Sequence, residues 1–369
     1  MVSFELDDEQ KMVQETMLSF ATDQMDPYLR ESEESGQVVQ DIISKGSELT
    51  IIASAVPEEY GGFGESASAL TGCIAYEELG WGDLSAALHL LSPTIFAYSV
   101  LHEGTEEQKK EYLPGFCEEQ FKPATGALVE PRFNYCASAL TATAVREGDD
   151  YILNGSKCFV PLADTAEYLL VFAATTPGAG FAGVDAFIVP AGTAGLTVGE
   201  REQNMGLNAL ATFELNMKDL KVNKGAKLGG DGGSDFLNLL ARSRLALGAL
   251  AIGMSRHALE FSRDYAKERV AFGEPIASRQ AIAFMIAEMA IEIDATRMLC
   301  WEAAWLADSK RDFAKEACMA KNYAADMALM VADRSVQIMG GHGYVRENPV
   351  ELWLRNARGV SSLDGMVMV

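Results

Sequence analysis

The sequence predicts an α+β protein built in three consecutive parts: a helical domain over residues 1–120, a β domain over 121–232 and a bundle of long helices over 233–369. Two observations indicate this order. Apolar residues recur at helical spacing in the first and last parts. In the middle part they occur in short runs bounded by Gly, Pro or Asn, which is typical of strands and turns.

The first part begins with a helical pattern. In "DDEQKMVQETMLSFATDQM" (7–25), Met12, Met17 and Phe20 recur at helical spacing, and the acidic residues at the start suit a helix N-terminus. Thr105 and Gln108 in "TEEQ" have the spacing of a capping box, which predicts another helix start. The segment "PEEYGGFG" (57–64) is interpreted as a glycine turn that closes the helical domain.

The middle part changes to strand patterns. In "LTATAVREGDDYILNG" (140–155), Gly148-Asp149-Asp150 and Asn154-Gly155 are both hairpin signals. Three further strands are expected, in "EYLLVFAAT" (167–175), "VDAFIVPA" (184–191) and "TFELNMKDLKV" (212–222). Together they predict a compact β domain.

The last part returns to helices. In the segment 279–308, one helix face is marked by Ile282, Ile286, Met289 and Ile293. Met285 widens this face, so we expect the helix to be packed on more than one side. Its many Met and Ala residues are interpreted as bundle core.

Composition excludes several classes of function. The formal net charge of −23 disfavours nucleic acid and anionic membranes as partners. The longest strongly apolar run (245–254) is about ten residues, whereas a membrane-spanning helix needs about 20, so no membrane span is expected. The first ten residues have no features of a secretory signal. Six cysteines without a C-x-x-C pair and four histidines without ligand spacing predict reduced thiols, no metal site and a cytoplasmic location.

The sequence resembles the acyl-CoA dehydrogenase family in five segments that follow the family's order. These are "PEEYGGFG" (57–64), "GALVEP" (126–131), "GDDYILNGSK" (148–157), "ERVAFGEPIASRQAI" (268–282) and "VQIMGGHGYVRENPVELWLRNAR" (336–358). The resemblance implies N-terminal helices, a middle β-barrel and a C-terminal four-helix bundle, usually in a tetramer. It also implies an FAD enzyme in which a carboxylate base removes the α-proton of an acyl-CoA, a β-hydride passes to FAD, and electrons leave to an electron-transfer flavoprotein.

The resemblance places Asp364 at the position of the catalytic base, which in the family is the Glu of a Tyr-Glu-Gly-Thr turn. The aspartate is one methylene shorter, and a misplacement of about 1 Å can cost about 10²-fold in rate. Some branches place the base before an Arg on a bundle helix instead; here that position is Ser243, before Arg244, which is expected to line the substrate pocket. The sequence stops where the family continues into a last helix, so Asp364 is alternatively a solvated acid near a frayed end.

A clamp for the adenine and pyrophosphate of FAD is also implied, and in the family it reaches across a subunit boundary. An arginine fork suits a pyrophosphate, and glycines allow close approach of the backbone. Alternatively, the arginine pairs with a carboxylate and the glycines only end a helix. The matching residues are Arg269, Phe272, Gln280, Gln337, Gly340 and Gly341.

The flavin-ring side matches the family less well. The family's Thr-Glu-Pro-Gly-Ala-Gly-Ser-Asp is 129–136 here, and Tyr135, a candidate substrate contact, replaces the serine. The family's Trp-Ile-Thr is 159–161. Phe159 can still stack on a ring, but Pro161 offers neither a hydroxyl nor an N–H. Backbone contacts to the ring from Leu128 and Val129 need no particular side chain.

Three hypotheses follow from this uneven match. The first is an active acyl-CoA dehydrogenase with Asp364 as base. The second is a partner subunit of a heteromeric dehydrogenase that lends its clamp to FAD held by a related chain. The third is a family member that acts on another thioester. A clamp that works between chains requires at least a dimer, and the bundle's apolar faces fit a homotetramer or a heterotetramer.

Overall fold

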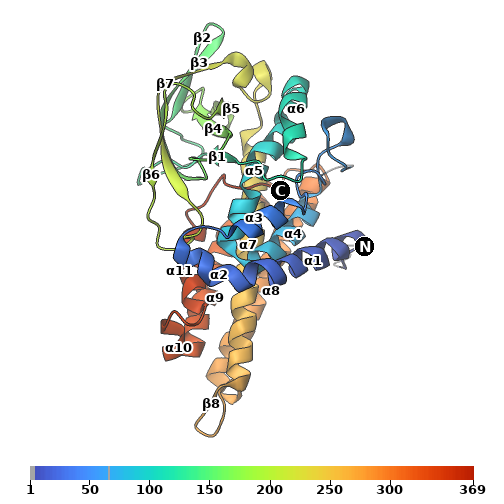
Figure 1. Ribbon diagram of the computed structural model, residues 1–369, viewed down its shortest axis with the longest axis vertical. Helices are drawn as coiled ribbons and strands as arrows, with labels where there is room; N and C mark the ends of the chain where they lie inside the picture. Colours follow the sequence, from blue (N-terminus) through green and yellow to red (C-terminus); the bar gives the residue numbers. More distant parts are fainter. Residues whose placement is uncertain (1–4, 65–66) are drawn as a thin grey trace.

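The computed structural model describes residues 5–64 and 67–369. The first four residues, part of the segment that is expected to lack a secretory signal, lie outside the described part. The predicted order of helices, strands and long helices is confirmed. Figure 1 shows the strands at one end of the longest axis, the N-terminal helices beside the middle of the molecule, and the long C-terminal helices reaching the opposite end.

The N-terminal helices are capped as their sequence predicts. Thr105 and Gln108 form the capping box at the start of α6, and Asp7 and Gln10 form another at α1. Met17 is buried in the core, whereas Met12 is 62% exposed and does not belong to it. The helices are α1 (Asp8–Phe20), α2 (Leu29–Ser35), α3 (Gln40–Ser47), α4 (Ala69–Gly82), α5 (Leu84–Glu103) and α6 (Glu106–Tyr112).

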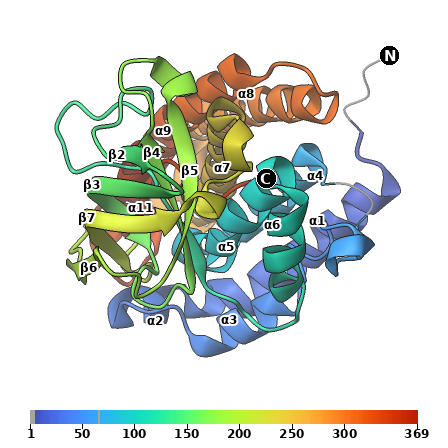
Figure 2. The same cartoon turned by 90° about the horizontal axis from the view of Figure 1, so that it is seen from above.

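The middle domain is one seven-stranded sheet. The strands are paired in the order β1-β4-β2-β3-β7-β6, and β5 pairs with β4. No pairing among the described residues joins β6 back to β1 or β5, so the expected barrel is a curled half-barrel (Figure 2). The strands are β1 (Ala124–Ala127), β2 (Thr143–Glu147), β3 (Asp150–Pro161), β4 (Tyr168–Ala174), β5 (Val184–Pro190), β6 (Leu196–Arg201) and β7 (Thr212–Asn223).

One of the two predicted hairpin turns is confirmed and the other is wrong. The β2–β3 hairpin turns at Gly148, and Glu147 pairs with Asp150. Asn154-Gly155 instead lies inside β3, at an irregularity in its pairing with β7. Gly155 has a φ of +140°, and a Cβ there would come within 2.6 Å of the Cα of Ala142. The glycine therefore serves close packing and not a turn.

The C-terminal bundle contains the predicted long helices. Met289 and Ile293 on α8 are buried, and Ile282 and Ile286 pack against the same core, so the predicted face is confirmed. The helices are α7 (Phe236–Glu268), α8 (Gln280–Asp308), α9 (Ala314–Met339), α10 (Gly341–Tyr344) and α11 (Val350–Val360); a hairpin of β8 (Val270–Ala271) and β9 (Glu274–Pro275) joins α7 to α8.

Two helices are long and apolar enough to cross a membrane by length and composition alone, α5 and α7. The apolar window of α5 is 83% buried inside the fold and that of α7 is 78% buried. They are therefore core helices of a soluble fold. Their apolar windows are longer than the run of about ten apolar residues found in the sequence.

Helices α4 and α7 cross at two glycines. A Cβ on Gly253 would lie 1.8 Å from the carbonyl oxygen of Glu77, and a Cβ on Gly80 would lie 2.3 Å from that of Leu250. The two helix backbones are thus too close at these positions to leave room for any side chain larger than that of glycine. This crossing fixes the N-terminal helices against the bundle.

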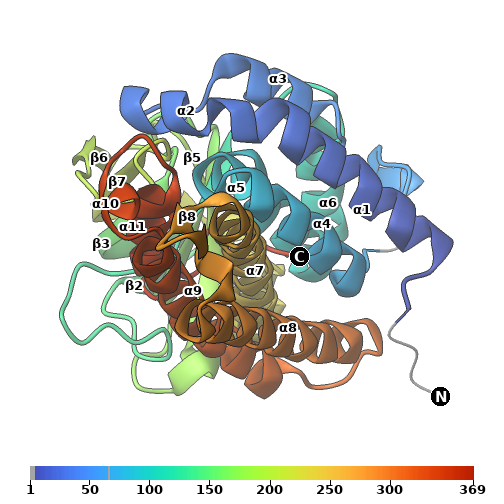
Figure 3. The same ribbon diagram turned by 90° about the horizontal axis from the view of Figure 1, so that it is seen from below.

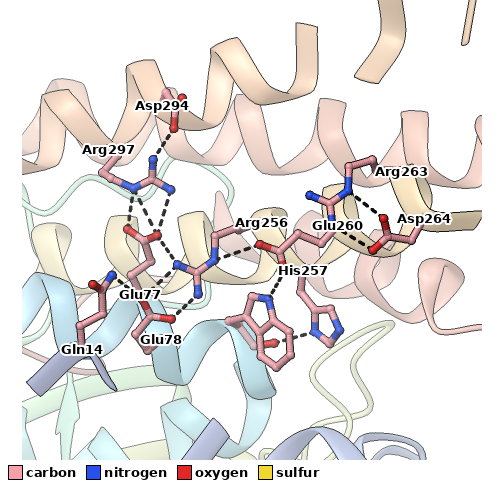
Figure 4. Close-up of polar contacts among 11 residues, drawn as sticks. Gln14, Glu77, Glu78, Arg256, His257, Glu260, Arg263, Asp264, Asp294 and Arg297 are labelled. Atoms are coloured by element: carbon pink, nitrogen blue, oxygen red, sulfur yellow. Dashed lines mark hydrogen bonds and ion pairs between the residues drawn. The ribbon is translucent and has the colours of Figure 1, made fainter. Parts of the chain in front are cut away.

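A buried network of charges reinforces the crossing (Figure 4). The Glu77 carboxylate of α4 accepts hydrogen bonds from Arg297 of α8, at 2.9 Å, and from Arg256 of α7, at 3.0 Å. Glu78 accepts from Gln14 of α1 at 2.9 Å and is also paired with Arg256. Two glutamates therefore join four helices, and each buried carboxylate has a cationic partner.

The helix crossing gives a test of the fold. We expect Gly253→Ala to lower the melting midpoint by at least about 3 °C or to abolish soluble protein, because overpacking costs about 1–3 kcal/mol or more. Thermal unfolding followed by circular dichroism measures this. Gly232→Ala is the control, since a Cβ there meets nothing within 4 Å. Equal midpoints for the two variants would contradict the tight crossing.

Candidate active site

Asp364 is buried and paired, and it is not a solvated acid near a frayed end. Its side chain is only 9% exposed. Arg244 of α7 donates from Nη2 to Oδ2 at 2.9 Å and from Nε to Oδ1 at 3.3 Å. Burial alone lowers the pKa of Arg244, but the hydrogen bond and the charge of Asp364 raise it above its ordinary value. The arginine is therefore a fixed cation, and both carboxylate oxygens of Asp364 face it.

The residue after Asp364 is also held by α7. The Gly365 N–H donates to Oγ of Ser243 at 3.1 Å. Ser243, which stands at the alternative base position, thus anchors the turn that presents Asp364. Gly365 has a φ of +67°. Glycine is required at 365 by this conformation. A Cβ added to Gly126 would lie only 2.4 Å from the carbonyl oxygen of Gly365, so Gly126 allows this segment to pass close to β1.

A cavity of about 460 Å³ opens beside Asp364, between the β domain and the bundle. The loop after β1, the end of β3, strand β7 and the segment after α11 all contribute to its wall. The lining residues include Val129, Tyr135, Phe159, Glu202, Glu214, Lys321 and Asp364.

The loop after β1 is held against β3 by a buried ion pair. Lys157 of β3 is fully buried; its Nζ donates to the Leu128 carbonyl at 3.0 Å and lies 3.2 Å from Oε1 of Glu130. Burial lowers the pKa of Lys157 to about 8, although Glu130 opposes the shift. The Glu130 carboxylate also accepts the N–H groups of Thr141 and Ala142. The loop that carries Val129 and Tyr135 is therefore rigidly placed.

Phe159 reaches the cavity through an irregularity in β3. The pairing of β3 with β7 shifts between Lys157 and Val160, and Phe159 has a φ of +52°. Its N–H donates to the carboxylate of Glu202 at 3.1 Å. The ring is available for stacking at the cavity wall, while its backbone donor is already occupied by an acid.

Tyr135 contributes a hydroxyl without a partner. Its oxygen is buried and forms no hydrogen bond among the described residues. Burial raises the pKa of the phenol, and the charge of Asp364 adds to this rise. A neutral O–H in this place is a donor that lacks an acceptor, as expected of a group that binds a ligand.

Lys321 of α9 is a second cation at the cavity. Its Nζ donates to the Ser361 carbonyl at 3.0 Å, and burial lowers the pKa of the ammonium. Lys321, Glu202 and Glu214 were not identified from the sequence. A lysine at a buried position among the alanines of α9 was the available signal for Lys321; nothing local marks the two glutamates.

The predicted clamp residues gather at the other end of the bundle. Figure 1 places β8 and α10 at the end of the long axis opposite the β strands. Arg269 caps α7 and Phe272, in the β8–β9 hairpin, is 96% exposed. The exposed positions of this cluster are Arg269, Phe272, Gln280, Gln337, Gly340 and Gly341. The structure therefore brings these six together but separates them from Asp364.

The alternative interpretations of the clamp have different outcomes. Among the described residues the Arg269 side chain has no ion pair, so it is not merely neutralised by a carboxylate. Gly340, in contrast, does end α9, with a φ of +57°. A Cβ at Gly340 or Gly341 would meet nothing within 4 Å, so both leave an open surface.

The residues present fit FAD as two separate halves. At the cavity, Phe159 offers a ring for stacking, and Lys321 offers a donor for a carbonyl oxygen. At the clamp, Arg269 and two exposed glutamines offer donors for phosphate and adenine beside open glycine backbone. Leu128 does not line the cavity: it is buried, and its carbonyl is taken by Lys157.

The chain is similar to known proteins over nearly its whole length. The chain matches the N-terminal domain of acyl-CoA dehydrogenase over residues 7–120, the middle domain over 127–220 and the C-terminal domain over 230–367. It is 37% identical to a probable acyl-CoA dehydrogenase of Bacillus subtilis, over 100% of this chain and 98% of that protein. It is 36% identical to subunit CarC of the caffeyl-CoA reductase–Etf complex of Acetobacterium woodii, over 98% and 96%.

Solved structures agree with the sequence relatives. Butyryl-CoA dehydrogenase from Megasphaera elsdenii superposes with a TM-score of 0.88 at 33% identity, over 98% of this chain and 95% of that one. The FAD complex of PigA superposes with a TM-score of 0.89 at 26% identity, over 97% and 94%. The chain therefore belongs to the acyl-CoA dehydrogenase family, whose members are FAD-dependent oxidoreductases acting on the CH–CH bond of acyl-CoA thioesters.

Proposed function

We propose that this chain is an active acyl-CoA dehydrogenase in which Asp364 is the base that removes the α-proton of the substrate. The observation that carries the proposal is a buried carboxylate at the wall of a cavity that is also lined by Tyr135, whose buried hydroxyl has no partner among the described residues. FAD, when bound, supplies the acceptor for the β-hydride. The remaining work falls to side chains of this chain.

Each of these side chains has a definite task. An oxygen of Asp364 takes the α-proton, and the two hydrogen bonds from Arg244 hold that carboxylate in a fixed orientation. Because the fork of Arg244 engages both oxygens, the proton must approach a lone pair outside the fork. The Tyr135 hydroxyl donates to the substrate, where a hydrogen bond stabilises negative charge that develops at the thioester oxygen.

The proposal includes an assembly of at least two chains. The clamp residues and the cavity are separate within one chain, so one FAD would be bound by the cavity of one chain and the clamp of the next. On α8, Phe284, Ile291, Met298 and Trp305 are exposed and recur every seven residues, which forms an apolar strip on one helix side. A homotetramer that buries this strip fits both features.

The electron acceptor we propose is an electron-transfer flavoprotein. The relative from Acetobacterium woodii is by name a subunit of a complex with Etf. The soluble fold is compatible with a cytoplasmic enzyme, which we propose as its location.

A specific observation supports a second candidate, the partner subunit of a heteromeric dehydrogenase. At the ring side, the Phe159 N–H donates to Glu202, whereas the side chains of the clamp residues are exposed and have no such partner among the residues that the structure describes. The flavin content of the purified chain separates the two. About one FAD per chain supports the active enzyme, whereas a colourless chain that gains flavin only with a related subunit supports the second candidate.

The assigned base can be tested by Asp364→Asn. An amide cannot accept the proton, so we expect the kcat for a saturated acyl-CoA to fall by about 10²-fold or more. Asp364→Glu is the matched variant: it keeps a carboxylate but moves it by one methylene, so its kcat should fall less than that of Asp364→Asn. FAD content and circular dichroism show whether each variant is folded. Unchanged turnover in the amide variant would rule out Asp364 as base.

The clamp can be tested by Arg269→Ala. A lost hydrogen bond between charged groups is worth about 1.5–3 kcal/mol, so we expect the Kd for FAD to rise at least about tenfold. Fluorescence titration with FAD measures it. Arg263→Ala is the control: it removes an exposed arginine in the last turns of α7, one that is paired with Asp264. Equal FAD affinity in both variants would contradict a clamp at Arg269.

The assembly can be tested by Ile291→Glu, which places a charge in the apolar strip of α8. We expect the complex to dissociate to a smaller species in analytical ultracentrifugation at micromolar concentration, and FAD to be lost with it. Met12→Glu, at an equally exposed methionine of α1, is the control and should leave the assembly intact. An unchanged sedimentation coefficient for Ile291→Glu would show that the strip is not an interface.

A further inference from the structure

Lys321 is a buried cation that forms no ion pair in the part of the chain that the structure describes. It is 7% exposed, and the alanines one turn away on either side of it in α9, Ala317 and Ala324, are fully buried. Its hydrogen bond goes to a backbone group, the Ser361 carbonyl, at 3.0 Å. Because burying a cation without a counter-ion costs free energy, an apolar side chain would be cheaper at this position.

The carbonyl that Lys321 binds belongs to the end of α11. Ser361 is the C-cap of this helix, and its N–H donates to the Gly359 carbonyl. The last carbonyl groups of a helix have no partner within the helix and carry a partial negative charge, so a cation is favourable there. Helix α11 lies beside α9 (Figure 3). Lys321 therefore fixes the end of α11 from the neighbouring helix.

The contact lies very close to the candidate base. Two residues separate Ser361 from Asp364, and they belong to no helix or strand. At the other end of this short segment, α7 holds Asp364 through Arg244, whose Nη2 donates to Oδ2 at 2.9 Å. Residues 361–364 all line the cavity beside the base, and so does Lys321. The segment that presents the base is thus attached to α9 at one end and to α7 at the other.

We propose that Lys321 is a positioning residue for the candidate base: by holding the Ser361 carbonyl, it sets where Asp364 stands at the cavity wall. This role rests on the proposed function of Asp364. A segment with one anchor can rotate about it and carry the Arg244 side chain along, whereas anchors on two different helices fix its place. In this role Lys321 acts through the backbone and touches no reacting atom.

The alternative is that Lys321 only stabilises the packing of α11. That helix is already anchored by apolar side chains: Leu352, Trp353 and Val360 are each at most 2% exposed. Its attachment to the bundle therefore does not depend on a buried ammonium. The irregular residues that follow α11 have no such apolar anchor before Leu363, so the contact at Ser361 matters most for them.

The test replaces the lysine by Lys321→Met, which removes the ammonium and keeps a long unbranched side chain. We expect the kcat of the FAD-loaded variant for butyryl-CoA to fall at least about tenfold, because a misplacement of about 1 Å can cost about 10²-fold. The Kd for butyryl-CoA should stay unchanged, since the lysine does not bind the substrate in this role. Lys315→Met, at an exposed lysine of the same helix, is the control and should keep the wild-type kcat.

A double-mutant cycle shows whether Lys321 acts through Asp364. In the Asp364→Asn background, Lys321→Met should cause no further fall in kcat, because the carboxylate that it positions is already gone. An equal fall in both backgrounds would overturn the proposal, and so would a folded, FAD-loaded Lys321→Met variant with the wild-type kcat. If Lys321→Met does not fold, Lys321→Leu replaces it in both measurements.

Failure of this role and failure of the proposed function give different results. If the FAD-loaded wild-type chain oxidises no saturated acyl-CoA, or if Asp364→Asn matches its turnover, the proposed function fails. The melting midpoints of the four proteins of the cycle then decide about Lys321 without any activity. Non-additive shifts support the coupling of Lys321 to Asp364, whereas additive shifts overturn it.

Discussion

The ion pair between Asp364 and Arg244 is the contact on which the arrangement of the site depends. Neither charge can be buried alone, because desolvation of an unpaired ion costs several kcal/mol. The pair therefore fixes the segment after α11 to α7. Ser243, next to Arg244, holds the following residue through the Gly365 N–H. The same two contacts thus place the candidate base and direct the chain behind it into the core, where Met366, Val367 and Met368 are buried.

The opposite wall of the cavity depends on a second buried pair. Lys157 and Glu130 tie the loop after β1 to β3, and the irregularity that follows Lys157 turns Phe159 to the cavity. One wall of the cavity is thereby attached to the sheet and the other to the helical bundle. A carboxylate and a stacking ring can keep a constant separation only if both bodies are fixed in this way. The crossing of α4 and α7 at Gly253 holds the bundle side.

Sequence patterns predicted the elements better than the site. The Thr105 capping box, the turn at Gly148 and the core face of α8 are all local signals, and each is found. Asn154-Gly155 has the same local signal as a hairpin, but tertiary contact with Ala142 decides its role. The burial of residues 366–369 was not predictable, because apolar residues at a chain end do not indicate which helices will enclose them. Glu202 follows β6 and accepts the Phe159 N–H of β3, although β7 lies between these strands in the sheet, and no sequence spacing reveals this contact.

The separation of clamp and cavity within one chain makes assembly a physical requirement for the proposed site, and the charge of the chain sets the condition for it. Each chain carries a formal charge of −23, so two copies repel one another at long range, although salt screens this beyond about 8 Å. At contact, the surface must carry little unpaired charge. Two acids beside the apolar strip of α8 meet this condition: Glu288 is paired with Arg334 and Asp294 with Arg297 of the same chain. Glu302, which is exposed between Met298 and Trp305, has no ion pair among the described residues and would have to stay at the solvent-exposed rim of an interface. Burying the rest of the strip removes apolar surface from water.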